Sequence, residues 1–192
     1  MHISVEGLDG VGKTTVCSLL SKEIDFEYVE KPLRYLFDNK NGKNYDTITK
    51  MINENPNRNI SAWFYCFGSL YLYDLFKTKN IITDRHLCIN YAYGGNDNTK
   101  VIYDSLLSLI GPPTLTVILY ANQNILKERI KKRCETDTDL LKHEDVEFMY
   151  KKMIMFCKMN KFEYIVINTE NHLPEEIVDM IKSKLNFRLE EK

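Results

Sequence analysis

The sequence has no excess of either charge. Its 26 lysines and arginines face 27 aspartates and glutamates, for a net charge of −1. Because a protein that holds nucleic acid through a broad basic field carries a clear positive excess, we expect no nucleic-acid partner. No apolar run approaches the roughly 20 residues that span a bilayer, and the first residues lack the basic and apolar segments of a signal peptide. We therefore expect no membrane partner and a cytoplasmic location.

Paired cysteines and metal-ligand spacings are also missing. The five cysteines lie far apart, without a C-x-x-C pair, and the four histidines show no spacing typical of metal ligands. This pattern argues against a disulfide framework or a zinc site and favours a reducing compartment. The length of 192 residues, with 44% apolar and 28% charged residues, predicts one globular domain over residues 1–192.

Strand-like and helix-like segments alternate along the chain. Short apolar runs rich in Val and Ile predict five strands, at 2–6, 26–30, 81–84, 115–120 and 164–167. Apolar stripes at helical spacing predict helices around 16–24, 64–75, 146–156 and 177–185. The polar segment 39–59 predicts a short helix near 48–52 flanked by loops, and the acidic segment 134–143 predicts a loop. The alternation indicates an α/β fold with a mainly parallel sheet.

A phosphate-binding loop follows the first strand. Gly7-Leu8-Asp9-Gly10-Val11-Gly12-Lys13-Thr14 matches G-x-x-x-x-G-K-[ST], in which backbone N–H groups and the start of a helix surround an anion. In this pattern the lysine reaches the β- and γ-phosphates and the hydroxyl that follows ligates Mg²⁺. We expect residues 7–15, Thr15 included, to bind ATP, with Lys13 catalytic and Thr14 a metal ligand.

A second charged motif ends the third predicted strand, at Asp84-Arg85-His86. The carboxyl ends of parallel strands form the crevice where ligands bind, so Asp84 is a candidate for the Mg²⁺ shell and Arg85 for clamping an acceptor phosphate. A switch GTPase needs a D-x-x-G motif after its third strand and an N-K-x-D motif. No D-x-x-G follows the third predicted strand here, and no N-K-x-D appears in the sequence. The pattern favours phosphoryl transfer to a small acceptor.

Residues 5–15 resemble the opening of the thymidylate kinases, F-E-G-x-D-G-x-G-K-[ST]-T. The segments at 84–86 and 92–95 resemble their D-R-[YH] and A-[YF]-[QT]-G motifs, and residues 112–120 with 125–130 resemble their P-D-L-T strand and the helix that leads to the lid. The resemblance implies the three-layer P-loop kinase fold, a five-stranded parallel sheet with helices on both faces. It also implies a homodimer and transfer of the ATP γ-phosphate, with Mg²⁺, to a deoxynucleoside monophosphate.

Site roles follow from the same resemblance. The acceptor would be bound by Asp9, Lys31, Phe64, Arg85 and Tyr93. Phe64 would stack on the base and Tyr93 would back the sugar. The lid would span about 131–144, with Lys131, Lys132 and Arg133 leading into it and Arg133 acting catalytically.

The sequence departs from the family pattern at several positions. The R-E-P-G-G motif after the second strand is replaced by Glu30-Lys31-Pro32-Leu33-Arg34, so Lys31 or Arg34 would have to hold the acceptor phosphate. The family's base-reading arginine falls on Gly68 and its motif serine on Ile89. A lid arginine falls on Thr138, which leaves Arg133, Lys131, Lys132 or Lys142 to supply positive charge.

Four alternatives stay open from the residues alone. Phe64 is either a base platform or core, whereas Phe67 and Tyr71 are expected in the core. Glu6 is either a structural partner or part of the Mg²⁺ shell. His86, which follows Arg85, is either a hydrogen-bonding neighbour or a catalytic residue, and the run 127–133 is either a solvated helix face or the approach to the lid.

The sequence therefore predicts a kinase that phosphorylates a deoxynucleoside monophosphate, dTMP above others. Two other functions compete with this prediction. A deoxynucleoside kinase would use Glu30 as a base toward a 5′-hydroxyl, although that group usually reads E-R-S where this chain has Asp84-Arg85-His86. A nucleotide-binding signalling protein would bind ATP with weak turnover.

Overall fold

The computed structural model describes residues 1–38, 43–133 and 145–190. Five parallel strands form one sheet in the order β2-β3-β1-β4-β5. Their bounds are β1 His2–Glu6, β2 Glu27–Glu30, β3 Ile81–Asp84, β4 Leu115–Tyr120 and β5 Tyr164–Asn168. The predicted strands are confirmed to within one residue at each end, and the parallel pairing confirms the α/β fold.

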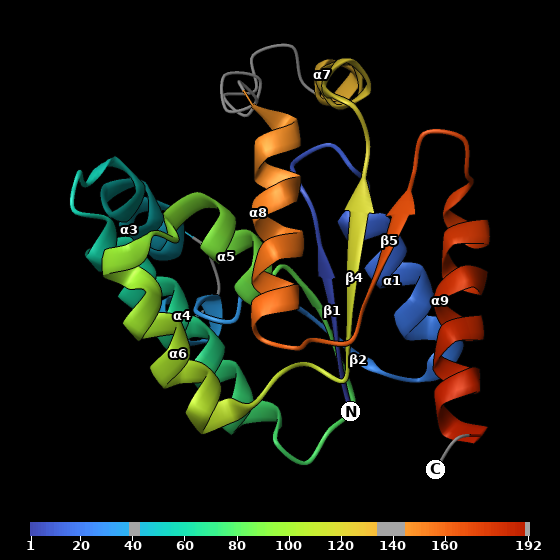
Figure 1. Cartoon of the computed structure of the whole chain (residues 1–192), viewed down its shortest axis with the longest axis horizontal. Helices are drawn as coiled ribbons and strands as arrows, with labels where there is room; N and C mark the ends of the chain where they lie inside the picture. The colour runs from blue at the N-terminus through green and yellow to red at the C-terminus, as the bar shows by residue number, and fades with distance from the viewer. Residues whose placement is uncertain (39–42, 134–144, 191–192) are drawn as a thin grey trace.

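Helices cover both faces of this sheet (Figure 1). On one side α1 (Lys13–Ile24) packs against α9 (Pro174–Glu190). The other side is covered by α4 (Arg58–Phe76), α5 (Leu87–Gly94), α6 (Asp97–Ile110) and α8 (Val146–Met159). The remaining helices are α2 (Arg34–Phe37), α3 (Lys43–Glu54) and α7 (Gln123–Arg133). This arrangement is the three layers that the sequence predicts.

Local signals explain where several helices begin. The Asn96 side chain accepts the N–H groups of Asn98 and Thr99, and Thr99 returns a bond to the N–H of Asn96, which forms a capping box for α6. Asn57 and Asp145 cap α4 and α8 with one bond each, since a side-chain oxygen accepts a backbone N–H of the first turn. By contrast, α1 starts after Gly12 without a side-chain cap. Its first N–H groups are therefore available to a ligand.

The core lies on both faces of β1 and β4. Ile3, Val5, Val117, Ile118 and Leu119 are fully buried there. Tyr91, Tyr103 and Phe156 pack as an aromatic cluster between α5, α6 and α8, with ring centroids 4.5 to 5.8 Å apart. Such a core holds the carboxyl ends of β1 and β3 at fixed positions, which is what the site requires.

Three expectations about helices were wrong. The helix predicted near 48–52 is the longer α3, and the structure adds α2, α5 and α6, for which the sequence pattern predicts no separate helix. The face of α4 was also wrong, because Phe67 is 45% exposed. The buried side of α4 instead consists largely of small residues, which allow close packing against α5 and α6, namely Ala62, Cys66, Gly68 and Ser69 with Leu72 and Phe76.

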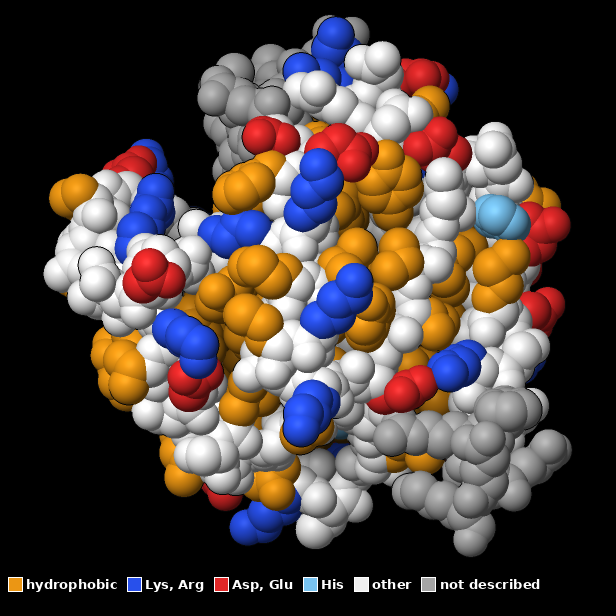
Figure 2. Space-filling model, in the orientation of Figure 1, with side chains coloured by type: hydrophobic (Ala, Val, Ile, Leu, Met, Phe, Trp, Pro, Cys, Tyr) orange, Lys and Arg blue, Asp and Glu red, His pale blue; other side chains and the backbone are white. Residues whose placement is uncertain are grey.

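The chain surface mixes apolar and basic groups. Figure 2 shows hydrophobic side chains over α6 and α8 with lysines among them, and Val101, Leu109, Phe148, Met155 and Met159 are exposed on these two helices. Within the described ranges, no helix has the length and apolar character needed to cross a membrane. The boundary at 1–192 stays a prediction, and residues 134–144 of the expected lid lie outside the described residues.

Candidate active site

The phosphate-binding loop joins β1 to α1. Gly7, Gly10 and Gly12 have φ angles of 141°, 84° and 100°, which L side chains rarely adopt. A Cβ at Gly7 would meet the Leu119 carbonyl oxygen at 2.5 Å, and one at Gly10 would meet the Leu126 carbonyl oxygen at 2.9 Å. Both the backbone angle and the lack of space for a Cβ therefore require glycine at positions 7 and 10. The loop is seated against β4 and α7 rather than lying free on the surface.

Lys13 is buried inside this loop. Its ammonium donates a 2.9 Å hydrogen bond to the Leu8 carbonyl oxygen and lies 3.9 Å from an Asp9 carboxylate oxygen. Burial, together with the positive charge of Arg85, lowers the pKa of Lys13 from 10.5 to about 8. An incoming anion would strongly stabilise a buried positive charge of this kind. The burial also shows that Lys13 is not a solvated surface lysine.

Thr14 and Asp84 join the loop to the third strand. The Thr14 hydroxyl donates a 2.6 Å hydrogen bond to Oδ2 of Asp84. The second carboxylate oxygen of Asp84, Oδ1, is buried and has no hydrogen-bond partner among the described residues. Because buried carboxylate oxygens are normally paired, this atom leaves an acceptor position for a cation or an ordered water.

Arg85 faces the phosphate-binding loop. Its guanidinium forms a hydrogen-bonded ion pair with the Asp9 carboxylate. The backbone N–H of Arg85 donates to the Val5 carbonyl oxygen at 2.9 Å, and its φ angle is 74°. The Arg85 side chain is 40% exposed while that of Asp9 is nearly buried, so Arg85 reaches from the end of β3 to the loop and stays partly accessible to solvent.

Glu6 is the structural partner among the two roles left open by the sequence. Its fully buried carboxylate accepts the backbone N–H groups of His86, Cys88 and Ile89 at 3.1 to 3.2 Å. It thus anchors the start of α5, directly after Arg85. Burial raises the pKa of Glu6 from 4.5 to about 7, even though these hydrogen bonds favour the charged form. Sequence reasoning left this role undecided because the donors lie some 80 residues away.

His86 contributes its backbone rather than its ring to this network. The ring is buried and packs edge-on against His2, with centroids 4.7 Å apart. Burial lowers the pKa of both histidines, that of His2 to about 3. His86 is a hydrogen-bonding neighbour, as predicted, but through its N–H to Glu6.

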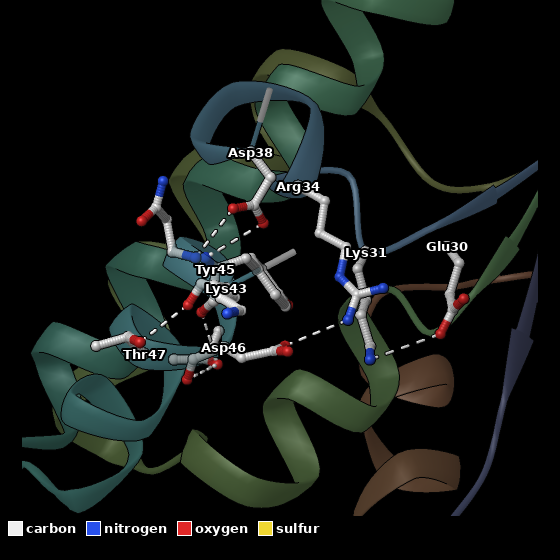
Figure 3. Close-up of polar contacts among 10 residues, drawn as sticks. Glu30, Lys31, Arg34, Asp38, Lys43, Tyr45, Asp46 and Thr47 are labelled. Atoms are coloured by element: carbon white, nitrogen blue, oxygen red, sulfur yellow. Dashed lines mark hydrogen bonds and ion pairs between the residues drawn. The ribbon is translucent and has the colours of Figure 1, made fainter. Parts of the chain in front are cut away.

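The segment after β2 presents two cations, which Figure 3 shows reaching two different carboxylates. Lys31 has a φ angle of 50°, and its Nζ lies 3.7 Å from Oε1 of Glu30. Arg34 donates a 3.2 Å hydrogen bond from Nη2 to Oδ1 of Asp46. The Arg34 guanidinium also lies over the Tyr45 ring, 5.5 Å from its centroid. Lys31 is therefore held beside the end of β2, and Arg34 is held against α3.

Tyr45 is a site neighbour that the sequence did not single out. It is buried at the start of α3, where Asp38 accepts its backbone N–H. Burial raises the pKa of its hydroxyl, and the charges of Arg85 and Arg34 oppose that rise. The positive charges of Arg85 and Arg34 therefore both favour the ionised form of the Tyr45 hydroxyl. No local motif in the sequence could have shown this.

The two predicted acceptor aromatics lie on different helices. Phe64 of α4 is half-buried, with its ring parallel to that of Phe37 and the centroids 6.2 Å apart. Tyr93 of α5 is exposed. Gly68 lies one turn beyond Phe64, and a Cβ there would meet Leu33 side-chain atoms at 3.1 and 3.2 Å. Leu33 therefore fills the position from which an arginine at 68 would extend.

The expected approach to the lid is the end of α7. Lys131, Lys132 and Arg133 form its last turn and are exposed, and Lys132 pairs with Glu128 at 2.6 Å. Arg133 is thus at the boundary of the described chain. Thr138 and Lys142, the other positions considered for the lid, lie outside the described residues.

The sequence of the chain matches a known protein family. The sequence model of the thymidylate kinase family matches residues 5–181. The chain belongs to the thymidylate kinase family. It is therefore a nucleotide kinase, a class that takes its phosphate from ATP.

Relatives within and around this family carry different names. A thymidylate kinase of Mesomycoplasma hyopneumoniae is 29% identical over 206 aligned residues, covering 94% of each chain. A putative adenylate kinase of Pyrococcus abyssi is 26% identical, and the alignment covers 98% of the present chain and 88% of the relative. The solved structure of deoxyadenosine kinase from M. mycoides with dCMP and dCDP has a TM-score of 0.64 at 20% identity, covering 97% and 99% of the two chains. This last likeness concerns the fold alone.

Proposed function

We propose that the protein transfers the γ-phosphate of ATP to a deoxynucleoside 5′-monophosphate, with dTMP as the leading acceptor. The observation that carries this proposal is the pairing of Arg85 with Asp9 across the phosphate-binding loop. Through Asp9 it brings the Arg85 guanidinium, proposed for the acceptor, near the Lys13 ammonium, proposed for the donor. In phosphoryl transfer two anions must be held in line and their repulsion neutralised, which is what two cations flanking one loop provide.

The donor side is assigned to residues 7–15. The N–H groups of the loop and of the start of α1 hold the phosphates, and Lys13 moves from the Leu8 carbonyl to the β- and γ-phosphate oxygens. On the acceptor side, Arg85 exchanges Asp9 for the acceptor phosphate. Asp9, Lys31, Phe64 and Tyr93 complete the proposed acceptor contacts. Because a monophosphate acceptor is already ionised, these residues need to position it rather than deprotonate it.

The donor set beside the loop fits Mg²⁺. Thr14 and Asp84 offer a hydroxyl and a carboxylate, and the unpartnered Oδ1 of Asp84 fits a hard cation or its bound water. When bound, the ion would neutralise charge on the ATP phosphates. Arg133, at the end of α7, is the proposed further source of positive charge toward the transferred group.

Assembly and location complete the proposal. Ile60, Trp63, Phe67 and Leu70 are exposed along one side of α4, at helical spacing, and this stripe supports a homodimer in which α4 packs against a second copy. Equilibrium sedimentation of Trp63→Glu, with a shift to monomer, tests that part. All four cysteines in the described ranges are free thiols, which supports a cytoplasmic site of action.

The deciding experiment is a coupled ADP assay with Mg·ATP and a panel of acceptors. We expect turnover with dTMP and none with thymidine. Turnover with thymidine but not dTMP would replace the proposal by a deoxynucleoside kinase. In that enzyme Glu30, which pairs with Asp84 in the sheet register, is the candidate base. Tight Mg·ATP binding without turnover on any acceptor would instead indicate a nucleotide-binding signalling protein.

A further inference from the structure

A cavity of about 210 Å³ lies at the end of the sheet opposite the phosphate-binding loop. His2, Ile81 and Thr114, at the amino ends of β1, β3 and β4, line it together with the second half of α4. Figure 1 shows the N-terminus at this end of the sheet and α7 at the other. His86, beyond the carboxyl end of β3, also lines the cavity, which therefore extends along the whole of β3. Since a cavity of about 150 Å³ holds benzene, this one has room for a single ring with substituents.

The walls of the cavity are apolar. Leu72 and Phe76 of α4 and Ile81 of β3 are buried along it, and Ile110 at the end of α6 adds to the same wall. A polar ligand body would lose its hydrogen bonds to water here, because these side chains offer no replacement. The walls therefore fit an aromatic or aliphatic body.

The closed end of the cavity is formed by two histidines. His86 is 4% exposed, and its ring stands edge-on to that of His2. Nε2 of His2 lies 2.9 Å from Oγ1 of Thr83, whereas Nδ1 of His86 is buried and makes no hydrogen bond to any residue that the structure describes. Buried polar atoms are normally paired, and the nitrogen of a neutral imidazole donates or accepts according to its tautomer. A hydroxyl, which can do both, is the group that fits this atom.

The open end of the cavity is cationic. Lys77 and Lys79 line it, and no Asp or Glu of the described ranges does so. Their ion-pair partners, Asp74 at 3.7 Å and Glu27 at 2.6 Å, lie outside the lining. Both lysines are more than half exposed, and exposed pairs of this kind contribute little to stability. Either lysine can therefore turn to an anionic group at the opening.

We propose that this cavity binds a small aromatic acid that carries a ring hydroxyl. The carboxylate lies toward Lys77 and Lys79, the ring lies against the apolar walls, and the hydroxyl meets Nδ1 of His86. No residue assigned above to phosphate transfer lines this cavity, so the site is separate from the proposed active site. Binding is nevertheless transmitted toward it, because His86 directly follows Arg85 and its backbone N–H donates to Glu6 at 3.1 Å.

The test is a titration of the ¹⁵N-labelled full chain, followed by amide NMR, with benzoate, 4-hydroxybenzoate and benzyl alcohol as probes. We expect 4-hydroxybenzoate to bind about threefold or more tightly than benzoate, through the hydrogen bond to His86. Benzyl alcohol, which lacks the charge, should bind more weakly than benzoate. The shifted resonances should include residues 76–81 and 85–89. Shifts confined to residues 7–15 would place the acids in the phosphate-binding loop and overturn the proposal.

Two variants test the two ends of the cavity. Lys77→Glu should weaken benzoate about threefold or more and leave benzyl alcohol unchanged. The matched control is Lys100→Glu, since Lys100 is an exposed lysine that pairs with an aspartate on α6; it should bind all three probes as wild type does. His86→Leu should make the affinities for benzoate and 4-hydroxybenzoate equal.

The wild-type protein alone can overturn the proposal, so the result does not depend on the folding of His86→Leu. Absence of binding, or equal affinities for benzoate and 4-hydroxybenzoate, would do so, as would unchanged benzoate binding in Lys77→Glu. All of these measurements record binding without turnover. Their outcome is therefore distinct from that of the coupled ADP assay.

Discussion

The hydroxyl of Thr14 donates a 2.6 Å hydrogen bond to Asp84, 70 residues further along the chain. This contact joins the first turn of α1 to the carboxyl end of β3, the neighbour of β1 in the sheet. Asp84 is followed at once by Arg85, which pairs with Asp9 of the loop. The proposed donor and acceptor halves of the site are therefore joined by two side-chain contacts, one on each side of the peptide between residues 84 and 85.

Replacement of Lys13 tests the donor side. We expect Lys13→Ala to remove ATP turnover while the fold survives, because the change removes a desolvated charge whose pKa burial already lowers. ADP release with Mg·ATP and dTMP measures the loss, and circular dichroism measures the fold. The control is Lys22→Ala, at an exposed position near the other end of α1. Its ATP turnover should equal that of the wild type. Turnover within tenfold of wild type in Lys13→Ala would contradict the assignment.

Asp84→Asn tests the proposed metal position. The amide keeps the shape of the side chain but loses the negative charge that would hold the cation, so the Mg²⁺ concentration for half-maximal activity should rise about tenfold or more. Titration of activity with Mg²⁺ at fixed ATP measures this shift. Asp104→Asn, whose carboxylate pairs with Lys100 on the surface, serves as the control. An unchanged Mg²⁺ requirement would remove Asp84 from the metal site.

Arg85→Lys separates charge from geometry. Lysine keeps the positive charge but cannot form the two parallel hydrogen bonds of a guanidinium. We expect KM for the monophosphate to rise about 10- to 100-fold, with a smaller change in KM for ATP. Arg58→Lys at the start of α4 is the matched control, since Arg58 is exposed. Equal changes in both KM values would show that Arg85 acts on the loop rather than on the acceptor.

The anchor at Glu6 predicts a pH dependence of stability. Since the pKa of Glu6 is raised from 4.5 to about 7 in the folded protein, the folded state binds the proton more tightly than the unfolded chain. The stability contributed by the protonated form is complete below pH 4.5 and is lost as pH rises through 7. The free energy of unfolding of wild type relative to Glu6→Gln should fall by about 3 kcal/mol between pH 4.5 and 7.5. Urea unfolding across this range measures it, and a constant difference would argue against the burial of an ionisable Glu6.

Gly10→Ala tests how the loop is seated. A Cβ at Gly10 would meet the Leu126 carbonyl oxygen and Ile130 Cγ1 at 2.9 Å, in addition to the strain of a φ of 84°. We expect a loss of about 1 to 3 kcal/mol in stability and faster amide exchange in α7. Gly111→Ala is the control for strain alone, because its φ is 70° and nothing lies within 4 Å of the added Cβ. Equal losses in the two variants would show that contact with α7 contributes nothing.

Much of this architecture follows from local sequence. The strands are short runs of Val and Ile, and the phosphate-binding loop is a contiguous motif, so both could be predicted from neighbouring residues. The buried face of α4 could not, because small residues such as Ala62 and Cys66 form it while Phe67 is exposed. A ranking by hydrophobicity predicts that the large residues of α4 face the core, whereas close packing between helices favours small residues on the buried side.

Long-range contacts account for the rest of the site. The Glu6 carboxylate accepts three N–H groups beyond residue 85, and the Tyr45 ring lies under the Arg34 guanidinium. Sequence spacing contains no information about such meetings, because they depend on the order of strands in the sheet. The packing of Leu33 against Gly68 is another long-range contact. Neither residue alone indicates that an apolar side chain takes the place of an arginine.

The left-handed backbone at Arg85 has a cost that the enzyme bears permanently. Its φ of 74° lies in the region that favours glycine, and a residue with a side chain is less stable there by about 1 kcal/mol. A glycine at this position would relax the main chain but remove the guanidinium that faces the loop. Selection for thermal robustness alone would therefore favour glycine at residue 85, whereas the proposed contact with the acceptor phosphate requires arginine.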